Sequence, residues 1–151
     1  MSTNNWYFNN EIYDNPTEEL VGFVYEITNK TSGRIYIGKK FFWGHKFSVK
    51  TSLIKSGKNK GNKVKKKTRI VIPSDWQSYY GSSVFLNNEI GQFGIDNYSR
   101  KILRLCTSKA ELSYYEAKEQ FERDVLLSDK YYNNFIGCKI HGSHLNKKIE
   151  K

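Results

Sequence analysis

Apolar and polar residues alternate along two neighbouring stretches of the chain, residues 21–28 and 33–38. A short polar linker of Asn, Lys, Thr and Ser, closed by a glycine, joins the two stretches. Two alternating runs around such a linker are typical of a β-hairpin. A third stretch, residues 98–106, alternates well enough to predict another strand of buried character.

Two later segments carry the signals of helix starts. Ser82 or Ser83 can cap a first helix, over residues 83–92. Ser108 and a glutamate three residues later form a capping box, which predicts a second helix running to about residue 127. The apolar positions of this second helix recur at helical spacing and predict a core-facing stripe of Tyr114, Ala117, Phe121 and Val125.

Shorter elements are predicted between and after these segments. Residues 41–43 form an apolar cluster at the expected start of a short helix, and residues 69–72 form a short strand closed by Pro73. A last helical turn is expected over residues 130–135. The order of elements predicts an α/β sandwich of the α+β kind, in which helices flank a small three-stranded antiparallel sheet.

The length of 151 residues indicates one domain with room for a real core. We assign this domain to residues 21–135. Residues 1–20 are polar and aromatic, and we expect them to form an arm draped on the domain. Residues 136–151 form a polar, basic tail.

The net charge of +10 is concentrated in one segment. Residues 46–69 contain ten lysines and arginines and no aspartate or glutamate, whereas the rest of the chain carries 15 of each sign. The centre of this segment has too few apolar residues to offset the cost of ordering, which predicts a mobile loop inserted into the domain. Basic loops commonly bind nucleic-acid phosphates, and a solvated or targeting-like basic cluster is the alternative. The predicted DNA-binding residues are Lys55, Lys58, Lys60, Lys63, Lys65, Lys66, Lys67 and Arg69.

Other features of the sequence indicate the cellular compartment in which the protein is expected. No apolar run approaches the length of a membrane span, and the N-terminus has neither the charge nor the apolar block of a signal peptide. Cys106 and Cys138 lack metal-binding spacing, so we expect a reduced, cytoplasmic protein without a membrane partner.

The predicted hairpin carries a tyrosine on each strand, Tyr25 and Tyr36. Because side chains alternate between the faces of a strand, the hairpin can place the two tyrosines side by side, with Gly38 leaving room above them. An ordinary hairpin with two packing tyrosines is the alternative.

The hairpin sequence resembles the signature of the GIY-YIG endonucleases. The second half, Tyr36-Ile37-Gly38, is intact, whereas the first half reads Phe23-Val24-Tyr25 and lacks its glycine unless Gly22 serves one place earlier.

The resemblance implies the sandwich fold over about residues 21–135 and a role for each tyrosine. Tyr25 would position or deprotonate the attacking water, and Tyr36 would do the same or hold the phosphate. A glutamate on the second helix would bind one Mg²⁺ or Mn²⁺, which needs only one protein carboxylate because it keeps several waters. We assign this role to Glu116 with Glu119 in reserve, and a solvent-facing helix charge is the alternative for either.

The cation of the site departs from the family pattern. A tyrosine with a pKa near 10 is a poor base at neutral pH, so a cation is expected nearby. The family places an arginine about ten residues after the second tyrosine, where this sequence has His45 and Lys46. Lysine keeps the charge but not the bidentate fork of arginine. Lys46, Lys40 or His45 is therefore expected to substitute, and Lys39 also lies near in sequence.

Two further candidates rest on the resemblance. A Tyr-Tyr-Gly-Ser-Ser stretch at residues 79–83 matches one that phage and intron-borne members carry before their middle helix, which makes Tyr80 a candidate. Tyr132-Asn133 resembles a late Tyr-Asn whose asparagine supports the site, with Asn134 as an alternate register. For Tyr80 the alternative is an aromatic side chain that packs in the core or a turn, and for Tyr132-Asn133 it is a surface turn.

These features favour a metal-dependent DNA endonuclease of low or short sequence specificity, active in the host cytoplasm if phage-encoded. A non-catalytic nucleic-acid-binding protein that retains the fold is the second hypothesis, because the first glycine is altered and the arginine is missing. A basic RNA-assembly module is the third. The oligomeric state is left open.

Overall fold

The computed structural model describes residues 4–139 and 142–145. The chain divides into two compact units. One unit consists of the residues up to Phe42 together with those from Asp75 onward, and the other is Trp43–Ser74. The predicted basic tail lies partly outside the described residues.

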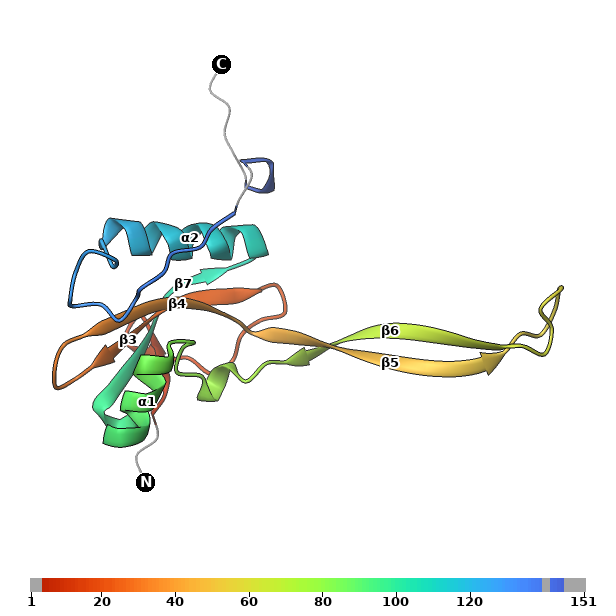
Figure 1. Cartoon of the computed structure of the whole chain (residues 1–151), viewed down its shortest axis with the longest axis horizontal. Coiled ribbons are helices and arrows are strands. Elements are labelled where there is room, and N and C mark those ends of the chain that lie inside the picture. Colours follow the sequence, from red (N-terminus) through yellow and green to blue (C-terminus); the bar gives the residue numbers. More distant parts are fainter. Residues whose placement is uncertain (1–3, 140–141, 146–151) are drawn as a thin grey trace, which may run out of the picture. The chain divides into compact units, whose positions relative to one another are not determined.

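The first unit is built on a mixed sheet that has five strands within the described residues, in the order β2-β1-β7-β3-β4 (Figure 1). These are β1 (Trp6–Phe8), β2 (Glu11–Ile12), β3 (Gly22–Asn29), β4 (Ile35–Phe41) and β7 (Tyr98–Cys106). β3 is antiparallel to both β4 and β7, as the three-strand prediction required. The mixed α+β class is confirmed, but the sheet is larger than predicted, because β1 pairs in parallel with β7 and β2 pairs with β1.

The extra strands come from residues 1–20, for which the sequence predicts a draped arm. Trp6 on β1 is 2% exposed, and its indole Nε1 donates a hydrogen bond to the Trp76 carbonyl oxygen at 2.7 Å. Its ring packs edge-on against Phe23, with 4.9 Å between the ring centroids. The segment therefore supplies part of the core, because a buried tryptophan contributes a large apolar surface and needs a partner for its N–H.

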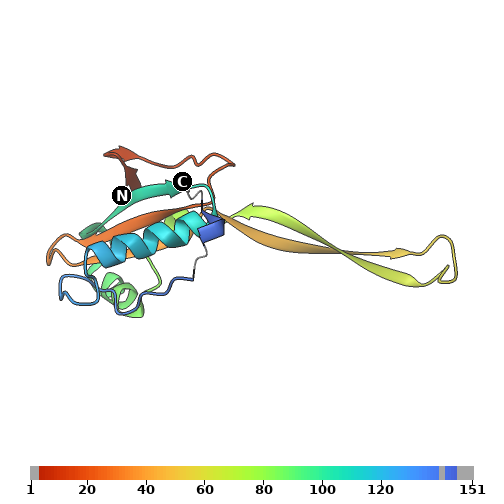
Figure 2. The ribbon, with the colours of Figure 1, turned by 90° about the horizontal axis from the view of Figure 1, so that it is seen from above.

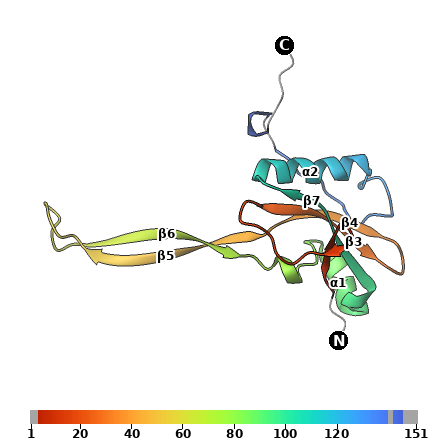
Figure 3. The same ribbon diagram turned by 180° about the vertical axis from the view of Figure 1, so that it is seen from behind.

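Two helices cover opposite faces of the sheet (Figure 3). α1 is Val84–Phe93 and α2 is Lys109–Glu122. Both predicted caps form, since Ser83 Oγ accepts from the Leu86 amide at 3.2 Å and Ser108 Oγ accepts from the Glu111 amide at 3.1 Å. Short 3-10 turns are η1 (Trp76–Ser78), η2 (Ile95–Asn97) and η3 (Gly142–His144).

The structure corrects the predicted face and length of the second helix. Leu112, Ala117 and Gln120 are the buried residues of α2, whereas Tyr114 is 41% and Phe121 is 64% exposed. Here α2 runs close to the sheet, since a Cβ added at Gly22 would lie 2.8 Å from Leu112 Cδ2. Small and aliphatic side chains therefore face the sheet. α2 ends at Glu122, with Asp124 at a positive φ of 49°. The helical turn predicted over 130–135 is absent, and that segment is irregular apart from one bridge at Tyr131.

The two faces of the sheet bury different kinds of side chain, aliphatic on one face and aromatic on the other. Under α2 lies an aliphatic cluster that contains Val24, Ile35, Ile37, Cys106, Leu112 and Val125. Phe23, Phe42 and Trp76 pack with Trp6 and Tyr25 in an aromatic cluster. Both cysteines are free thiols, and Cys106 is buried whereas Cys138 is exposed. None of the helices described is both long and apolar enough to cross a membrane.

The second unit is a long antiparallel ribbon, β5 (Trp43–Leu53) paired with β6 (Lys63–Pro73) over eleven residue pairs (Figure 2). The mobile loop predicted over residues 46–69 is therefore wrong for most of that range, and only residues 54–62 form the connection. The short helix expected from 41–43 is absent, because Phe41 ends β4 and Trp43 begins β5. Backbone pairing forms this ribbon although all residues of β6 are exposed, so its order does not depend on a buried core.

Replacing Trp6 with alanine tests whether the N-terminal segment belongs to the core. Trp6→Ala should lower the free energy of unfolding by about 3–5 kcal/mol, the usual cost of emptying a buried tryptophan site. Tyr7→Ala on the same strand, where Tyr7 is 39% exposed, should cost much less. Urea unfolding of both variants measures the difference, and equal costs would contradict the packing of Trp6 in the core.

Candidate active site

Three tyrosines meet on the face of the sheet opposite α2. Tyr25 on β3 and Tyr36 on β4 have ring centroids 6.1 Å apart, as the predicted hairpin allows. Tyr79, which follows η1, meets Tyr25 edge-on at 6.0 Å, and their hydroxyls are hydrogen-bonded. We call Tyr25, Tyr36 and Tyr79 the tyrosine cluster.

Two glycines make room for this cluster. Gly38 lies opposite Tyr25 in the β3–β4 ladder, and a Cβ there would overlap the Tyr25 hydroxyl. Gly81 has a φ of +90°, and a Cβ there would lie 3.1 Å from Tyr36 Cε1 and 3.3 Å from the Tyr25 hydroxyl. A side chain at either position would displace a tyrosine, which gives a physical reason for the glycine of the Tyr-Ile-Gly half of the motif.

A register shift in the sheet adjoins Tyr25. Val24 pairs with Arg104 whereas Tyr25 pairs with Ile102, so Leu103 is the extra residue of a β-bulge in β7. Bulges bend a strand locally and re-aim neighbouring side chains, and they are frequent beside active sites. In the sequence, the consecutive apolar residues Ile102 and Leu103 interrupt the alternation at this point, but such a pair is equally typical of a strand buried on both faces.

The tyrosines are held in their neutral form. Burial is the main cause that raises the pKa of Tyr25 well above 10, and the neighbouring Tyr36, Tyr79 and Glu116 add to the shift. Burial also raises the pKa of Tyr36, although a hydrogen bond with Ser82 opposes the shift. Both hydroxyls are therefore suited to donate hydrogen bonds at neutral pH rather than to remove a proton.

Tyr36 borders a small polar hollow. Its hydroxyl lies 3.0 Å from Ser82 Oγ. The hollow, of about 190 Å³, is lined by Tyr36, Ser82, Ser83, Tyr132, Asn133, Asn134 and Phe135. The polar side chains beside Tyr36 thus come from two separate parts of the sequence.

Two of the remaining candidate residues, Asn133 and Glu116, bind the backbone at the outer edge of β4. Ile35 donates its amide to the Lys130 carbonyl and accepts from the Tyr132 amide, both at 2.8 Å. At Ile37, the Asn133 side chain accepts from the amide at 3.0 Å and donates to the carbonyl at 2.8 Å. Gln120 Nε2 also donates to that carbonyl at 3.1 Å. Asn133 is therefore a buried support for the strand between Tyr36 and Gly38.

Glu116 on α2 binds the next outward-facing residue of the β4 edge, which is Lys39. The Lys39 amide donates to its carboxylate, and Lys39 Nζ lies 3.8 Å from Glu116 Oε1. The Glu116 side chain is 14% exposed, and burial raises its pKa against the opposing effect of Lys39. Its charge also contributes to the raised pKa of both Tyr25 and Tyr36, so the carboxylate lies within electrostatic range of the two tyrosines.

Glu119, the reserve candidate, belongs to a different cluster. Its carboxylate accepts from Arg123 Nε at 3.0 Å, and Arg123 Nη1 also binds Glu26 at 2.8 Å. The geometry thus favours Glu116 over Glu119, although the metal role of either residue stays a prediction.

The structure separates the candidate cations. Lys39 Nζ donates to Ser113 Oγ at 2.8 Å beside Glu116. Lys40 Nζ lies 2.6 Å from Asp75 Oδ1 and 4.0 Å from the Tyr79 ring centroid. His45 and Lys46 lie on β5, in the second unit, and their part in the site stays a prediction.

Tyr79 belongs to the tyrosine cluster through its contact with Tyr25, whereas the predicted candidate Tyr80 points to a different partner. The Tyr80 ring stacks on the Arg100 guanidinium, with 4.3 Å between Arg100 Cζ and the ring centroid. Arg100 is 2% exposed and donates to the carbonyls of Gln77 and Tyr79, both at 2.9 Å. This buried arginine orients the segment so that Tyr79 faces Tyr25. The sequence signal for Tyr79 is the same Tyr-Tyr-Gly stretch, in which the two tyrosines cannot be told apart.

The residues present are compatible with Mg²⁺ or Mn²⁺. No group of three or more His, Cys, Asp or Glu that could hold a metal ion occurs within the described part of the chain. Magnesium, however, binds through one or two carboxylates and keeps several waters. A single partly buried carboxylate, as at Glu116, fits that requirement.

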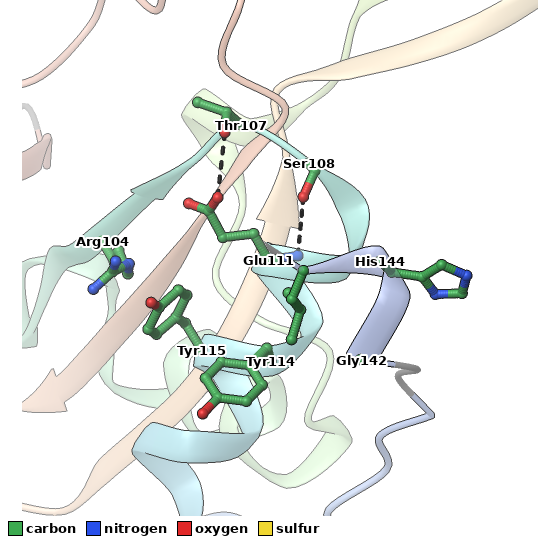
Figure 4. Close-up of a pocket in the computed structure, with 9 residues that line it drawn as sticks. Arg104, Thr107, Ser108, Glu111, Tyr114, Tyr115, Gly142 and His144 are labelled. Atoms are coloured by element: carbon green, nitrogen blue, oxygen red, sulfur yellow. Dashed lines mark hydrogen bonds between the residues drawn. The ribbon is translucent and has the colours of Figure 1, made fainter. Parts of the chain in front are cut away.

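A larger hollow lies elsewhere, at the N-terminal end of α2 (Figure 4). Its volume is about 630 Å³, and Arg104, Glu111, Tyr114, Tyr115 and His144 are among its lining residues. The Glu111 carboxylate accepts from Thr107 Oγ1 at 3.3 Å, and Arg104 stacks on Tyr115. This hollow contains none of the candidate residues, so its size does not make it the site.

Comparisons with known proteins agree with the geometry. Residues 6–136 match the model of the family described as "Putative endonuclease segE, GIY-YIG domain". The chain is also 28% identical over 116 residues to a protein of Enterobacteria phage T4 named "Putative endonuclease segC". That match covers 76% of this chain and 42% of the relative. No solved structure matches the chain.

The raised pKa of Glu116 predicts a stability cost at neutral pH. Between the ordinary pKa of 4.5 and the raised folded-state pKa, the folded protein binds more protons than the unfolded chain, so stability falls as the pH rises through that window. Glu116→Gln removes the charge. We expect a higher Tm than that of the parent at pH 7, and a difference that shrinks below pH 4.5.

Thermal unfolding followed by circular dichroism at several pH values measures this effect. Glu119→Gln is the matched control, because it breaks a partly exposed ion pair and should lower the Tm slightly or leave it unchanged. A lower Tm for Glu116→Gln at pH 7 would mean that the attraction to Lys39 outweighs the burial of the carboxylate.

Proposed function

Since the chain belongs to the GIY-YIG endonuclease family, we propose that it is a metal-dependent enzyme that hydrolyses phosphodiester bonds of DNA. The observation that carries this proposal is that Tyr25 and Tyr36 lie side by side, with Glu116 close enough for its charge to raise the pKa of both. Hydrolysis forms a bond between a water oxygen and phosphorus and breaks the bond to the leaving oxygen. The water loses a proton, and the leaving oxygen gains one.

Each residue of this group would have a role that suits its protonation state. The neutral hydroxyls of Tyr25 and Tyr36 orient the attacking water or donate to a phosphate oxygen, and Tyr79 holds Tyr25 in place. Glu116 would hold Mg²⁺ or Mn²⁺, which when bound stabilises the charge that develops on the phosphate and the leaving oxygen. Lys39 favours the ionised form of Glu116 that a metal requires.

The cation that replaces the family arginine is one of Lys40, His45 and Lys46. Lys40 is supported by its position over the Tyr79 ring, from which its charge can act near the hydroxyls. Lysine lacks the planar fork of arginine, so this cation would act as a point charge on the phosphate.

We further propose loose or short sequence specificity. The excess positive charge of the chain lies in residues 46–69, and contacts to phosphates carry no sequence information. The phage relative supports action on DNA in the cytoplasm of a host cell.

A non-catalytic DNA-binding protein is the second candidate function. It is favoured by one specific observation, which is that no arginine occurs between Arg34 and Arg69. A protein of this kind would bind DNA in the presence of Mg²⁺ and leave it intact.

Cleavage of supercoiled plasmid with and without Mg²⁺ tests the enzyme. Tyr36→Phe and Glu116→Gln should each slow cleavage at least about 100-fold, because each removes an interaction worth several kcal/mol in the transition state. Glu119→Gln, on the same helix as Glu116, and Tyr80→Phe, whose ring stacks on Arg100, are the controls and should cleave at nearly the parental rate. DNA binding without cleavage in Mg²⁺ or Mn²⁺ would instead establish the non-catalytic candidate.

A pair of glycine variants tests the packing above the tyrosines. Gly81→Ala and Gly94→Ala introduce similar backbone strain, of about 1–2 kcal/mol, because both glycines have a φ near +90°. Only the Cβ at position 81 meets Tyr36 and the Tyr25 hydroxyl, and nothing lies within 4 Å of a Cβ at position 94. We expect Gly81→Ala to slow cleavage at least about 10-fold beyond Gly94→Ala. Equal rates would show that the tyrosines tolerate displacement.

A further inference from the structure

The ribbon of β5 and β6 carries an exposed surface that extends well beyond the two candidate cations His45 and Lys46. Trp43–Ser74 holds ten lysines and arginines and no aspartate or glutamate. Several apolar side chains of the ribbon are also exposed, including Phe47 at 61% and Val71 at 60%. A surface of this composition requires an anionic partner rather than a protein of mixed charge.

The register of the strands places cations on both faces of the ribbon. Directly opposed residues of an antiparallel pair share a face, and successive residues alternate between faces. Lys50 faces Lys66, so these two lysines share one face, which we call the first face. Thr51 faces Lys65 and Val49 faces Lys67, which places Lys65 and Lys67 on the second face.

Repulsion within the ribbon opposes its folding. Lys50 and Lys66 are directly opposed like charges, which destabilise a strand pair. An isolated two-stranded hairpin is in any case only marginally stable in water. A partner that brings phosphates to both faces would remove this repulsion and stabilise the paired strands.

We propose that this ribbon lies in the major groove of duplex DNA, with the lysines of its two faces contacting phosphates on opposite sides of the groove. The choice of DNA rests on the proposed function. A β-sheet is about 10 Å thick with its side chains, and the major groove is about 12 Å wide. Eleven residues at ~3.4 Å each extend about 37 Å, close to one turn of the double helix.

Other anionic surfaces fit the ribbon less well. A lipid headgroup surface would attract one face and leave the lysines of the other without a partner. The minor groove of B-form DNA is only about 6 Å wide. The major groove of double-stranded RNA is deep and narrow, so side chains do not reach into it.

The experiment measures DNA affinity against salt for three variants that each remove two charges. Lys50→Gln with Lys66→Gln alters the first face, and Lys65→Gln with Lys67→Gln alters the second face. Lys58→Gln with Lys60→Gln alters the connection between the strands. Fluorescence anisotropy with a duplex of about 30 base pairs in EDTA, from about 50 to about 400 mM KCl, reports binding without cleavage. Failure of the proposed enzyme activity would therefore leave this result unaffected.

Both face variants should reduce the slope of log affinity against log salt by about 1.8, because each phosphate that is no longer neutralised lowers the slope by ~0.9. The decrease in affinity between about 50 and about 200 mM salt should then be about 12-fold smaller than for the parent. A change confined to one face would indicate a flat binding surface, and a change confined to the connection would indicate a flexible basic loop. Either outcome would overturn the groove proposal.

Two controls complete the test. Arginine at the same four positions, in matched pairs, should retain the parental slope, which shows that the glutamine variants act through charge and not through misfolding of the ribbon. The parent should bind the DNA duplex at least about 10-fold more tightly than an RNA duplex of the same sequence. Equal affinity for RNA, or competition by the minor-groove ligand netropsin but not by the major-groove ligand methyl green, would overturn the assignment of the groove.

Discussion

The free edge of β4 is the constraint on which the first unit depends. An edge strand presents unpaired N–H and C=O groups, and leaving such a group buried without a partner costs about 1–3 kcal/mol. Ile35, Ile37 and Lys39 turn these groups outward, and each is bound by a later part of the chain. The segment around Tyr131, the buried Asn133 and helix α2 are all fixed against this one edge. The same hydrogen bonds therefore satisfy the edge strand and hold these later segments against it.

The candidate site follows from the same edge. Asn133 holds Ile37 between Tyr36 and Gly38, and the Lys39 amide holds Glu116 at the end of the series. Glu116 is thus placed by a backbone hydrogen bond at a position where burial raises its pKa, so ionisation of this carboxylate reduces stability. Strained or costly groups of this kind persist where surrounding structure determines them, and they gather at functional sites.

The two units are stabilised by different interactions. The first buries an aliphatic cluster under α2 and an aromatic cluster beneath the other face of the sheet, and both clusters include residues distant in sequence. The second has exposed side chains along all of β6 and depends on the backbone ladder of β5 and β6. Low apolar content predicts a mobile loop, yet a ladder of backbone hydrogen bonds requires only extended residues of suitable β-propensity, such as Phe47 and Val49.

The sequence by itself determined the β3–β4 hairpin, the strand at residues 98–106, both helix caps and the placement of Tyr25 beside Tyr36, because each depends on local spacing or on a short turn. It also identified Glu116 as a candidate, through the resemblance of its helix. The tertiary structure alone decided that Trp6 enters the core, that Tyr79 rather than Tyr80 meets Tyr25, and that α2 turns Phe121 outward. These outcomes depend on packing and hydrogen bonds between residues far apart in the chain, such as Arg100 with Tyr80, which no local pattern records.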